Sequence, residues 1–474
     1  MYKCRMFTQD SFVGKKVTVM GLGLNDGGVG TVRFLSEMGA KEILVTDLKT
    51  KEELQVSLEA LKDIRGIRYV LGEHREQDFI ETDLVIKNPG LSWTNPFIQI
   101  AETHNVPVTL DAGIFFDLCK APIIGVTGTK GKTTTASLIA HLLEENKQRV
   151  VRVGISRISV LGELKKVQEG SVVVFELSSW RLSALSRIQK SPLLSVVTNV
   201  YPDHQNYYDS MEAYVEDKKN IFRFQSSGAV ILNADNAWTQ AMAADAPAGV
   251  IWFSRATQAS SDGFTLVSDR IIEAQSGYHQ EIASLAGTSL LGEHNYDNAL
   301  AAVAAVRTFG MKPTVIQQGL SSFRGVPHRL ELVGTRKGVR FYNDSAATIP
   351  EASIAALESF EGPVYLIVGG TDKELDFHRL AVAILDRAKG VVFLKGTGTE
   401  KLLKELENLL VQKKTEIQKW TVVESMGKAV ELAARNAESG DVVLLSPGAA
   451  SFGLFKNEFD RGDQFREQVQ ALSE

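Results

Sequence analysis

The sequence predicts an α/β fold of three domains, because strand, glycine-rich turn and helix follow one another at several places along its 474 residues. At roughly 150 residues per domain, this length accommodates three domains. Apolar runs that end in small polar residues before a helix are typical of parallel strands in doubly wound sheets. We expect a Rossmann-like domain at residues 1–120, a central P-loop ATPase domain with a mainly parallel sheet at 121–325, and a C-terminal Rossmann-like domain at 326–474.

The composition is that of a globular protein, with 44% hydrophobic and 23% charged residues. The net charge of −5 provides no basic surface of the kind that binds nucleic acid. We see no signal peptide and no apolar run of about 18 residues, so we expect a cytoplasmic monomer that contacts neither membrane nor nucleic acid. Cys4 and Cys119 are too few for a disulfide framework or a metal cluster, so we expect passive thiols in a reducing compartment.

The first domain begins with a nucleotide-binding βαβ pattern. A strand at Lys16–Met20 runs into the glycine turn Gly21-Leu-Gly23-Leu24, and a helix at Thr31–Met38 follows. The next strand, Glu42–Thr46, ends at Asp47. A nicotinamide fingerprint requires a third glycine at position 26, where this chain has Asp26, so the sequence disfavours NAD. Each glycine could also serve only to make a tight turn.

Two further strands complete the predicted first sheet. Asp83–Ile86 leads to Lys87-Asn88-Pro89-Gly90, and Val106–Thr109 leads to another helix. Because loops after parallel strands gather at one edge of a sheet, we expect these loops to form a ligand site with the glycine turn.

The second domain opens with a phosphate-binding pattern: the apolar run Pro122–Ile124, the turn Gly125–Thr135 and the helix Ala136–Leu143. Lys132 would reach the terminal phosphates, and the Thr133 hydroxyl would ligate Mg²⁺. The neighbouring loop residues expected at the phosphates are Gly128, Thr129, Lys130, Gly131 and Thr134. The loop is a variant, because the general template has glycine where this chain has Val126; the alternative is a Gly/Thr-rich turn with a solvated lysine.

Further polar residues of the second domain follow apolar strands or open helices. The strand Ser171–Phe175 ends at Glu176, and a carboxylate at the end of a buried strand beside a phosphate loop is an expected Mg²⁺ ligand. The strand Leu194–Thr198 leads to Asn199 and His204. Tyr214 and Lys218 share one face of a helix, and Asn295 and Asn298 open another. The alternatives are a hydrogen-bonded loop histidine, an exposed lysine and a helix cap at Asn295.

These motifs resemble those of the Mur ligases. G-x-T-G-T-x-G-K-T is similar to the ATP loop of Mur ligases and folylpolyglutamate synthetases, and E-L-S-S, N-x-x-x-D-H, Y-x-x-x-K, G-x-H-N-x-x-N and H-R-x-E follow in the family's order. The resemblance implies ligases that use ATP and Mg²⁺ to activate a carboxylate as an acyl phosphate. It implies metal contacts from Thr133, Glu176, His204 and a carbamylated Lys218, and ATP contacts from Asn295, Asn298, Arg329 and Asp344.

The resemblance also implies that the first domain holds the uridine diphosphate part of a substrate. The corresponding residues are Gly21, Gly23, Leu24, Asp47, Asn88, Pro89, Gly90, Ser156 and His204. Ser156 replaces an asparagine that the family has near the muramyl sugar. Arg329 could alternatively form an interdomain salt bridge.

The last domain repeats the pattern of strands that end in small polar residues. The strands Val339–Tyr342, Val364–Val368 and Val442–Leu445 predict a second doubly wound sheet. S-P-x-x-A-S-F, followed by F-K-N and R-G, resembles the glutamate-adding members of the family. The implied amino-acid contacts are Lys373, Thr348, Ser451 and Phe452.

The resemblance therefore implies an enzyme that adds glutamate to UDP-N-acetylmuramoyl-L-alanine in peptidoglycan precursor synthesis. D-glutamate is favoured, but Ala346 stands where the glutamate-adding members usually have a lysine, which leaves L-glutamate open. Two alternatives are a ligase similar to folylpolyglutamate synthetase and a non-catalytic ATP-binding regulatory protein. The complete βαβ unit disfavours the first, and Lys132, Glu176 and Lys218 disfavour the second.

Overall fold

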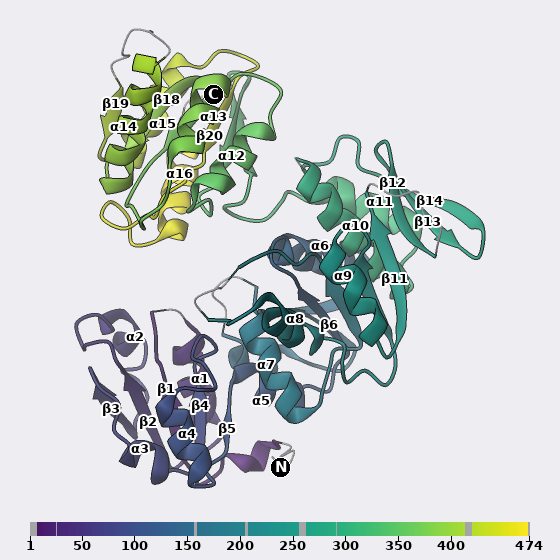
Figure 1. Cartoon of the computed structure of the whole chain (residues 1–474), viewed down its shortest axis with the longest axis vertical. Coiled ribbons are helices and arrows are strands. Elements are labelled where there is room, and N and C mark those ends of the chain that lie inside the picture. The colour runs from purple at the N-terminus through teal and green to yellow at the C-terminus, as the bar shows by residue number, and fades with distance from the viewer. Residues whose placement is uncertain are drawn as a thin grey trace. The chain divides into compact units, whose positions relative to one another are not determined.

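The structure is a computed structural model that describes residues 7–24, 26–155, 159–203, 207–255, 262–290, 292–412 and 420–472 (Figure 1). The chain divides into two compact units. The first unit contains Met1–Ala286 and Asp297–Leu320, and the second contains Gly287–Tyr296 and Ser321–Glu474. Over the described residues the strands form three sheets, one after another along the chain.

The first sheet has the strand order β3-β2-β1-β4-β5, and its neighbouring strands are parallel. This is the predicted Rossmann-like arrangement. We did not predict β3, because it is half exposed and lacks a continuous apolar run. The strands are β1 (Lys16–Met20), β2 (Glu42–Asp47), β3 (Ile67–Leu71), β4 (Leu84–Lys87) and β5 (Val108–Thr109). The helices are η1 (Gln9–Ser11), α1 (Asp26–Glu37), α2 (Gln55–Glu59), α3 (Gln77–Ile80), α4 (Pro96–Thr103) and α5 (Asp111–Leu118).

The second sheet has the order β14-β13-β12-β11-β10-β9-β6-β8-β7. Its neighbouring strands are parallel except for the pairs β12–β13 and β13–β14, which are antiparallel. The strands are β6 (Ile123–Thr127), β7 (Arg149–Val153), β8 (Ser171–Glu176), β9 (Leu194–Val197), β10 (Ala229–Asn233), β11 (Gly249–Ser254), β12 (Gly263–Val267), β13 (Arg270–Gln275) and β14 (Tyr278–Ser284). The helices are α6 (Lys132–Glu145), η2 (Leu161–Lys166), α7 (Ser179–Ile188), α8 (Met211–Lys219), α9 (Ala237–Met242), η3 (Ala243–Asp245), α10 (Glu293–Thr308) and α11 (Pro313–Ser322).

The third sheet has the order β15-β16-β20-β17-β18-β19, and β15 is antiparallel to β16 while the other pairs are parallel. The strands are β15 (Glu331–Arg336), β16 (Val339–Asn343), β17 (Val364–Val368), β18 (Ala388–Leu394), β19 (Thr421–Val423) and β20 (Val442–Leu445). The helices are α12 (Pro350–Glu358), α13 (His378–Arg387), α14 (Thr397–Gln412), α15 (Met426–Asn436) and α16 (Glu458–Ala471).

Apolar side chains of the strands are buried on both faces of the sheets, as expected for parallel strands between helices. In the first unit, α5 packs against α7, and the rings of Phe115 and Phe175 meet edge to face at 5.2 Å. In the second unit, separate apolar clusters cover the two faces of the third sheet. These cores fix the strands, so the loops at their carboxyl ends are held in place.

The fold class predicted from the sequence, a three-domain α/β protein with mainly parallel sheets, is confirmed. The domain boundaries after residues 120 and 325 remain a prediction. Within the described ranges, the structure contains no helix long and apolar enough to span a lipid bilayer.

Candidate active site

The loop between β6 and α6 has two positions at which only glycine fits. Gly128 has a φ of 150°, and an added Cβ would lie 1.9 Å from Thr198 Oγ1. Gly131 has a φ of 82°, and its Cβ would lie 2.1 Å from Asn298 Oδ1. Both positions are strained or blocked for any residue with a side chain, so the sequence specifies the loop's path.

The loop after β9 holds the phosphate loop in place. The Thr129 backbone N–H donates to the Asn199 carbonyl oxygen at 2.9 Å, and the Lys130 N–H donates to Asn199 Oδ1 at 2.9 Å. Thr133 and Thr134 lie half-buried in the first turn of α6. Gly125, which we expected to open the turn, instead lies inside β6, where an added Cβ would lie 2.4 Å from Pro192 Cγ.

Two lysine amines converge on one carbonyl oxygen of this loop. Lys132 Nζ donates to the Gly128 oxygen at 3.0 Å and to the Thr129 oxygen at 2.9 Å. Lys218 Nζ, from α8, also donates to the Gly128 oxygen at 3.0 Å. Like charges so close disfavour each other's ionisation unless an anion lies between them.

Lys218 is buried, and the alternative of an exposed lysine is therefore wrong. Its exposure is 1%, and its amine lies 4.4 Å from the centre of the Tyr214 ring. Burial, followed by the charge of Lys132, holds the pKa of Lys218 well below its ordinary value. The Tyr214 hydroxyl is 3.2 Å from Thr129 Oγ1, so the predicted Tyr–Lys pair lies directly under the phosphate loop.

Glu176 and Asn298 also lie beside this loop. Glu176 ends β8 and pairs in register with Val126 of β6, which puts it at the carboxyl edge of the sheet. Asn298, buried in α10, has its Oδ1 3.3 Å from Thr135 Oγ1. Asn295 lies in the first turn of the same helix, in the part assigned to the second unit. Two other predicted residues, His204 and Ser156, lie outside the described residues.

A cavity of about 370 Å³ lies at the carboxyl edge of the first sheet. Six of the residues expected to contact the uridine diphosphate part of a substrate line this cavity: Gly21, Gly23, Leu24, Asn88, Pro89 and Gly90. Asp47 shapes the glycine turn, since its carboxylate accepts hydrogen bonds from the Gly23 N–H at 3.0 Å and the Lys49 N–H at 2.9 Å. Asn88 Oδ1 accepts from the Gly90 N–H at 3.0 Å and so shapes the facing loop.

Lys87, which lies in a loop expected to form the site but was not chosen as a contact, also lines this cavity. Sequence reasoning missed four further lining residues: Asp111, Ser178, Trp180 and Arg181. The Lys87 amine donates to the Leu91 oxygen at 2.8 Å, and burial lowers the pKa of Lys87 to about 7. Arg181 Nη2 donates to Asp111 Oδ2 at 3.0 Å. A lysine at the end of an apolar strand was a usable signal for Lys87, whereas Arg181 has the appearance of an ordinary surface residue of a helix.

The predicted amino-acid residues lie at the carboxyl edge of the third sheet. An antiparallel bridge joins Thr371 to Ala450, so the loops after β17 and β20 lie together. Lys373 Nζ is 5.6 Å from the ring centre of Phe452, and Ser451 is buried. Thr348 follows β16, the other neighbour of β20, and is half-buried.

Two charged residues in this region are deeply buried. Asp344 accepts hydrogen bonds from Ser446 Oγ at 2.8 Å and from the Leu330 N–H at 3.2 Å, and burial raises its pKa to about 7. Burial of Arg461, from α16, lowers the pKa of its guanidinium to about 10. Arg329, the predicted phosphate contact, is exposed.

Only some of the residues expected to bind a metal ion offer an oxygen ligand. Among the described residues, no group of three or more His, Cys, Asp or Glu side chains could hold a metal ion. The hydroxyl of Thr133 and the carboxylate of Glu176 are ligand types that Mg²⁺ prefers. The Lys218 amine could become an oxygen donor only through carbamylation, and the donor set fits Mg²⁺ on that condition.

A glycine loop between a central parallel strand and a helix, with lysine amines on its carbonyl oxygen, defines a P-loop protein of the α/β class. The chain belongs to the Mur ligase family, whose members are ATP-dependent ligases. It matches the family models described as Mur ligase MurD-like, N-terminal domain at residues 15–110, Mur ligase middle domain at 126–306, and Mur ligase, glutamate ligase domain at 328–448.

Curated relatives match along almost the entire chain. The UDP-N-acetylmuramoylalanine–D-glutamate ligase of Roseiflexus sp. (strain RS-1) is 42% identical, over 97% of this chain and 99% of the relative. The ligase of the same name from Borreliella burgdorferi is 38% identical, over 96% of this chain and 97% of the relative. A solved structure, UDP-N-acetylmuramate-alanine ligase MurC from Thermotoga maritima, has the same fold, with a TM-score of 0.61 at 20% identity over 96% of this chain and 99% of that one.

Proposed function

We propose that this chain joins D-glutamate to UDP-N-acetylmuramoyl-L-alanine in the cytoplasm, with conversion of ATP to ADP and phosphate. The terminal carboxylate of the alanyl substrate attacks the γ-phosphorus of ATP, which gives an acyl phosphate and ADP. The amine of glutamate then attacks the acyl carbon, phosphate leaves, and the amine loses a proton as the amide forms. The D-glutamate ligases that match 96% and 97% of this chain support the assignment.

The observation that carries the proposal is the convergence of Lys132 and Lys218 on the Gly128 oxygen at 3.0 Å each. The Lys132 cation and a second amine donor, both placed on one neutral oxygen, suit a site whose natural occupant is an anion. We assign the ATP phosphates to this site, with contacts from the glycine loop, Asn295, Asn298, Arg329 and Asp344. Lys132 and Arg329 would stabilise the charge of the transferring phosphoryl group.

Mg²⁺ would be held by Thr133, Glu176 and carbamylated Lys218, with His204 at a second ion. The bound metal would supply positive charge to the phosphate oxygens. The low pKa of Lys218 favours a neutral amine, which is the form that reacts with CO₂. This supports carbamylation at Lys218 rather than at Lys219, which is paired with Glu216 at 2.6 Å and Asp245 at 2.7 Å.

We place the uridine diphosphate part of the substrate in the cavity of the first sheet. The turn Gly21–Leu24, the loop Asn88–Gly90 and Asp47 would contact it, with Ser156 and His204 toward the sugar. The volume of about 370 Å³ suits a large polar ligand of which part extends beyond the cavity.

Glutamate would bind at the third sheet, to Lys373, Thr348, Ser451 and Phe452. A substrate with two carboxylates needs cations, and Ala346 removes one that the glutamate-adding members usually carry. Lys373 would then make the main charged contact. D-glutamate is the proposed substrate because the relatives carry that name, and L-glutamate is the variant that rate measurements with each enantiomer would detect.

The test is turnover by Lys132→Ala. We expect a loss of several orders of magnitude with an unchanged thermal unfolding midpoint, because the substitution removes charge stabilisation from the phosphoryl group. Lys62→Ala, which removes an exposed lysine paired with Glu59 in the same unit, serves as the control and should retain full activity. Near-normal turnover by Lys132→Ala would remove the proposed mechanism.

A further inference from the structure

The turn that carries Arg329 has an unusual backbone. His328 has a φ of 64° and Leu330 a φ of 44°, so the residues on both sides of Arg329 are in the left-handed region. Neither is glycine, and such conformations are unfavourable for L-residues. They persist only where the surrounding structure holds them, and they cluster at functional sites. The question is which contacts hold this turn.

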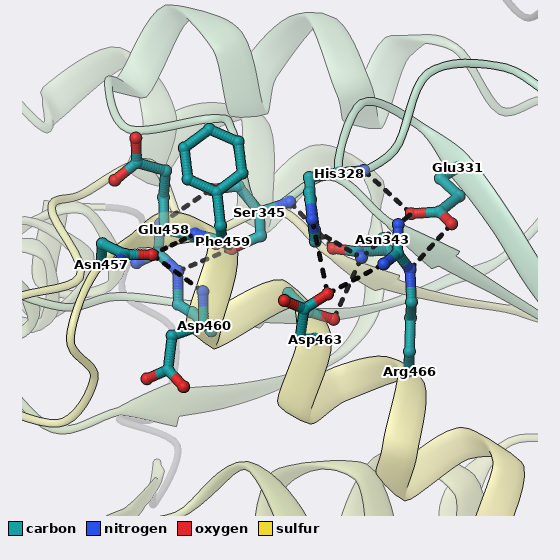
Figure 2. A network of polar contacts seen from close by, with 12 residues as sticks. His328, Glu331, Asn343, Ser345, Asn457, Glu458, Phe459, Asp460, Asp463 and Arg466 are labelled. Carbon is teal, nitrogen blue, oxygen red and sulfur yellow. Dashed lines mark hydrogen bonds and ion pairs between the residues drawn. The ribbon is translucent and has the colours of Figure 1, made fainter. Parts of the chain in front are cut away.

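Glu331 and Arg466 hold the turn from the side of α16. The Glu331 carboxylate accepts a hydrogen bond from the His328 backbone N–H at 2.9 Å. Arg466 Nε and Nη2 donate to the two oxygens of that carboxylate, both at 2.9 Å, which is the bidentate geometry that fixes orientation (Figure 2). Arg466 therefore orients the acceptor that the strained turn requires.

Asn343 and Gly462 make a second set of contacts with the turn. Asn343 is fully buried, and its Nδ2 lies 3.1 Å from His328 Nδ1 and 3.2 Å from Glu331 Oε2 (Figure 2). The same Nδ2 lies 3.2 Å from the Gly462 oxygen. A Cβ added to Gly462 would lie 2.1 Å from His328 Nδ1. Glycine inside a helix is costly relative to alanine, and this close approach of α16 to the His328 ring explains its presence.

The His328 ring is held as a neutral side chain. Burial, followed by the positive charge of Arg466, lowers the pKa of His328, while Asp463, Glu331 and Glu458 oppose that shift. With Nδ1 accepting from Asn343, the hydrogen of the neutral ring lies on Nε2, which is 3.6 Å from Asp463 Oδ1. Asp463 also accepts from Arg466 Nη1 at 2.8 Å, so one network joins the ring to the clamp.

The other end of the turn is fixed by the loop after β16. The Leu330 N–H donates to Asp344 Oδ1 at 3.2 Å, and the Ala346 N–H donates to the His328 oxygen at 3.0 Å. The backbone of the turn is therefore bound at His328 and Leu330, while the Arg329 side chain stays exposed.

We infer that α16 is a positioning element for Arg329: Arg466, through Glu331, and Gly462, through His328 and Asn343, hold the strained turn in the conformation that binds ATP. The inference rests on the proposed contact of Arg329 with the ATP phosphates. Arg466 and Gly462 are positioning residues that act through the turn and not on the nucleotide itself.

The test is a double-mutant cycle on the full-length enzyme with the dissociation constant of a non-hydrolysable ATP analogue as the readout. Arg466→Met should weaken binding at least tenfold, which corresponds to about 1.4 kcal/mol, because the turn loses its clamp. In an Arg329→Met background, Arg466→Met should cause no further loss, since the contact that it positions is already gone. Arg466→Lys keeps the positive charge but cannot make the bidentate contact, so its dissociation constant should lie between those of the wild type and Arg466→Met.

Lys389→Met is the matched control, because Lys389 also bridges two carboxylates of the second unit, Asp441 at 2.9 Å and Glu438 at 3.1 Å. It should leave ATP-analogue binding unchanged. Equal losses from Arg466→Met in the wild-type and Arg329→Met backgrounds, or a loss no larger than that of Lys389→Met, would overturn the inference. If Arg466→Met does not fold, the same cycle with Arg466→Lys decides.

Failure of the proposed function has a different signature. In that case the wild-type enzyme would bind the ATP analogue but release no ADP with UDP-N-acetylmuramoyl-L-alanine and glutamate. The binding cycle does not depend on that reaction.

Discussion

Arg461 of α16 should be a main determinant of the local stability of the amino-acid site. Its side chain is 0% exposed, and its guanidinium donates from Nε to Ser345 Oγ at 3.0 Å, from Nη1 to the Ala449 oxygen at 3.1 Å, and from Nη2 to the Ser345 oxygen at 2.9 Å. These bonds join the loop after β16 to the loop after β20. Arg461→Met retains the apolar stem and removes every donor.

The magnitude follows from two opposing contributions. Three buried acceptors lose their donor, at about 1–3 kcal/mol each. In the opposite direction, the substitution removes the free-energy cost of burying a cation. The drop in the pKa of Arg461 from 12.5 to about 10 corresponds to a cost of roughly 3 kcal/mol. We therefore expect a net loss of roughly 3 kcal/mol in local stability.

Hydrogen exchange of peptides from α16 and the loop after β20 measures this loss. At about 1.4 kcal/mol per decade, their amides should exchange roughly 100-fold faster in Arg461→Met. Arg435→Met, at an exposed arginine of α15, is the control and should leave exchange unchanged. If α16 in Arg461→Met exchanges at the wild-type rate, the three hydrogen bonds do not stabilise this site and the reasoning is refuted.

Three further substitutions test individual side chains. Lys218→Ala should abolish turnover and recover in part with acetate, which can supply oxygen ligands to Mg²⁺, whereas Lys219→Ala should remain active; the reverse pattern in a turnover assay would show that we have chosen the wrong lysine. Lys373→Ala should raise the KM for glutamate at least tenfold with little change for ATP, and an unchanged glutamate dependence would put the cation elsewhere. Asp344 has a pKa raised from 3.8 to about 7 by burial, so the folded state keeps a proton that the unfolded chain loses. The stability of the wild type relative to Asp344→Asn should therefore fall, by roughly 3–4 kcal/mol, as the pH rises from about 4 to about 7, and stay level above that; a pH-independent difference in urea unfolding would contradict the raised pKa.

The phosphate loop and the glycine turn of the first domain could be predicted because they are local. A strand, a turn with glycines at Gly128 and Gly131, and a helix are adjacent in the chain, and each is specified by nearby residues. The same holds for Tyr214 and Lys218, which share a helix face. The convergence of Lys132 and Lys218 on one oxygen required the packing of α8 under the loop, which no local pattern specifies.

The buried polar residues of α16 could not be predicted for a related reason. Arg461 and Arg466 lie in a helix that is rich in charged residues and resembles a solvent-exposed one. Their partners, Ser345 and Glu331, lie more than 100 positions earlier in the chain. Gly462 carried the usable signal, since a glycine inside a helix indicates that another group comes close.

The measurement that tests the central claim most directly is ADP release by the wild-type enzyme with ATP, Mg²⁺ and UDP-N-acetylmuramoyl-L-alanine, with D-glutamate, L-glutamate or no amino acid added. The proposed function predicts rapid ADP release with D-glutamate, together with a nucleotide product that is heavier by one glutamyl residue. Without an amino acid, release should stay at background. ADP release that does not depend on the muramoyl substrate, or no release with either enantiomer, would contradict the proposed function.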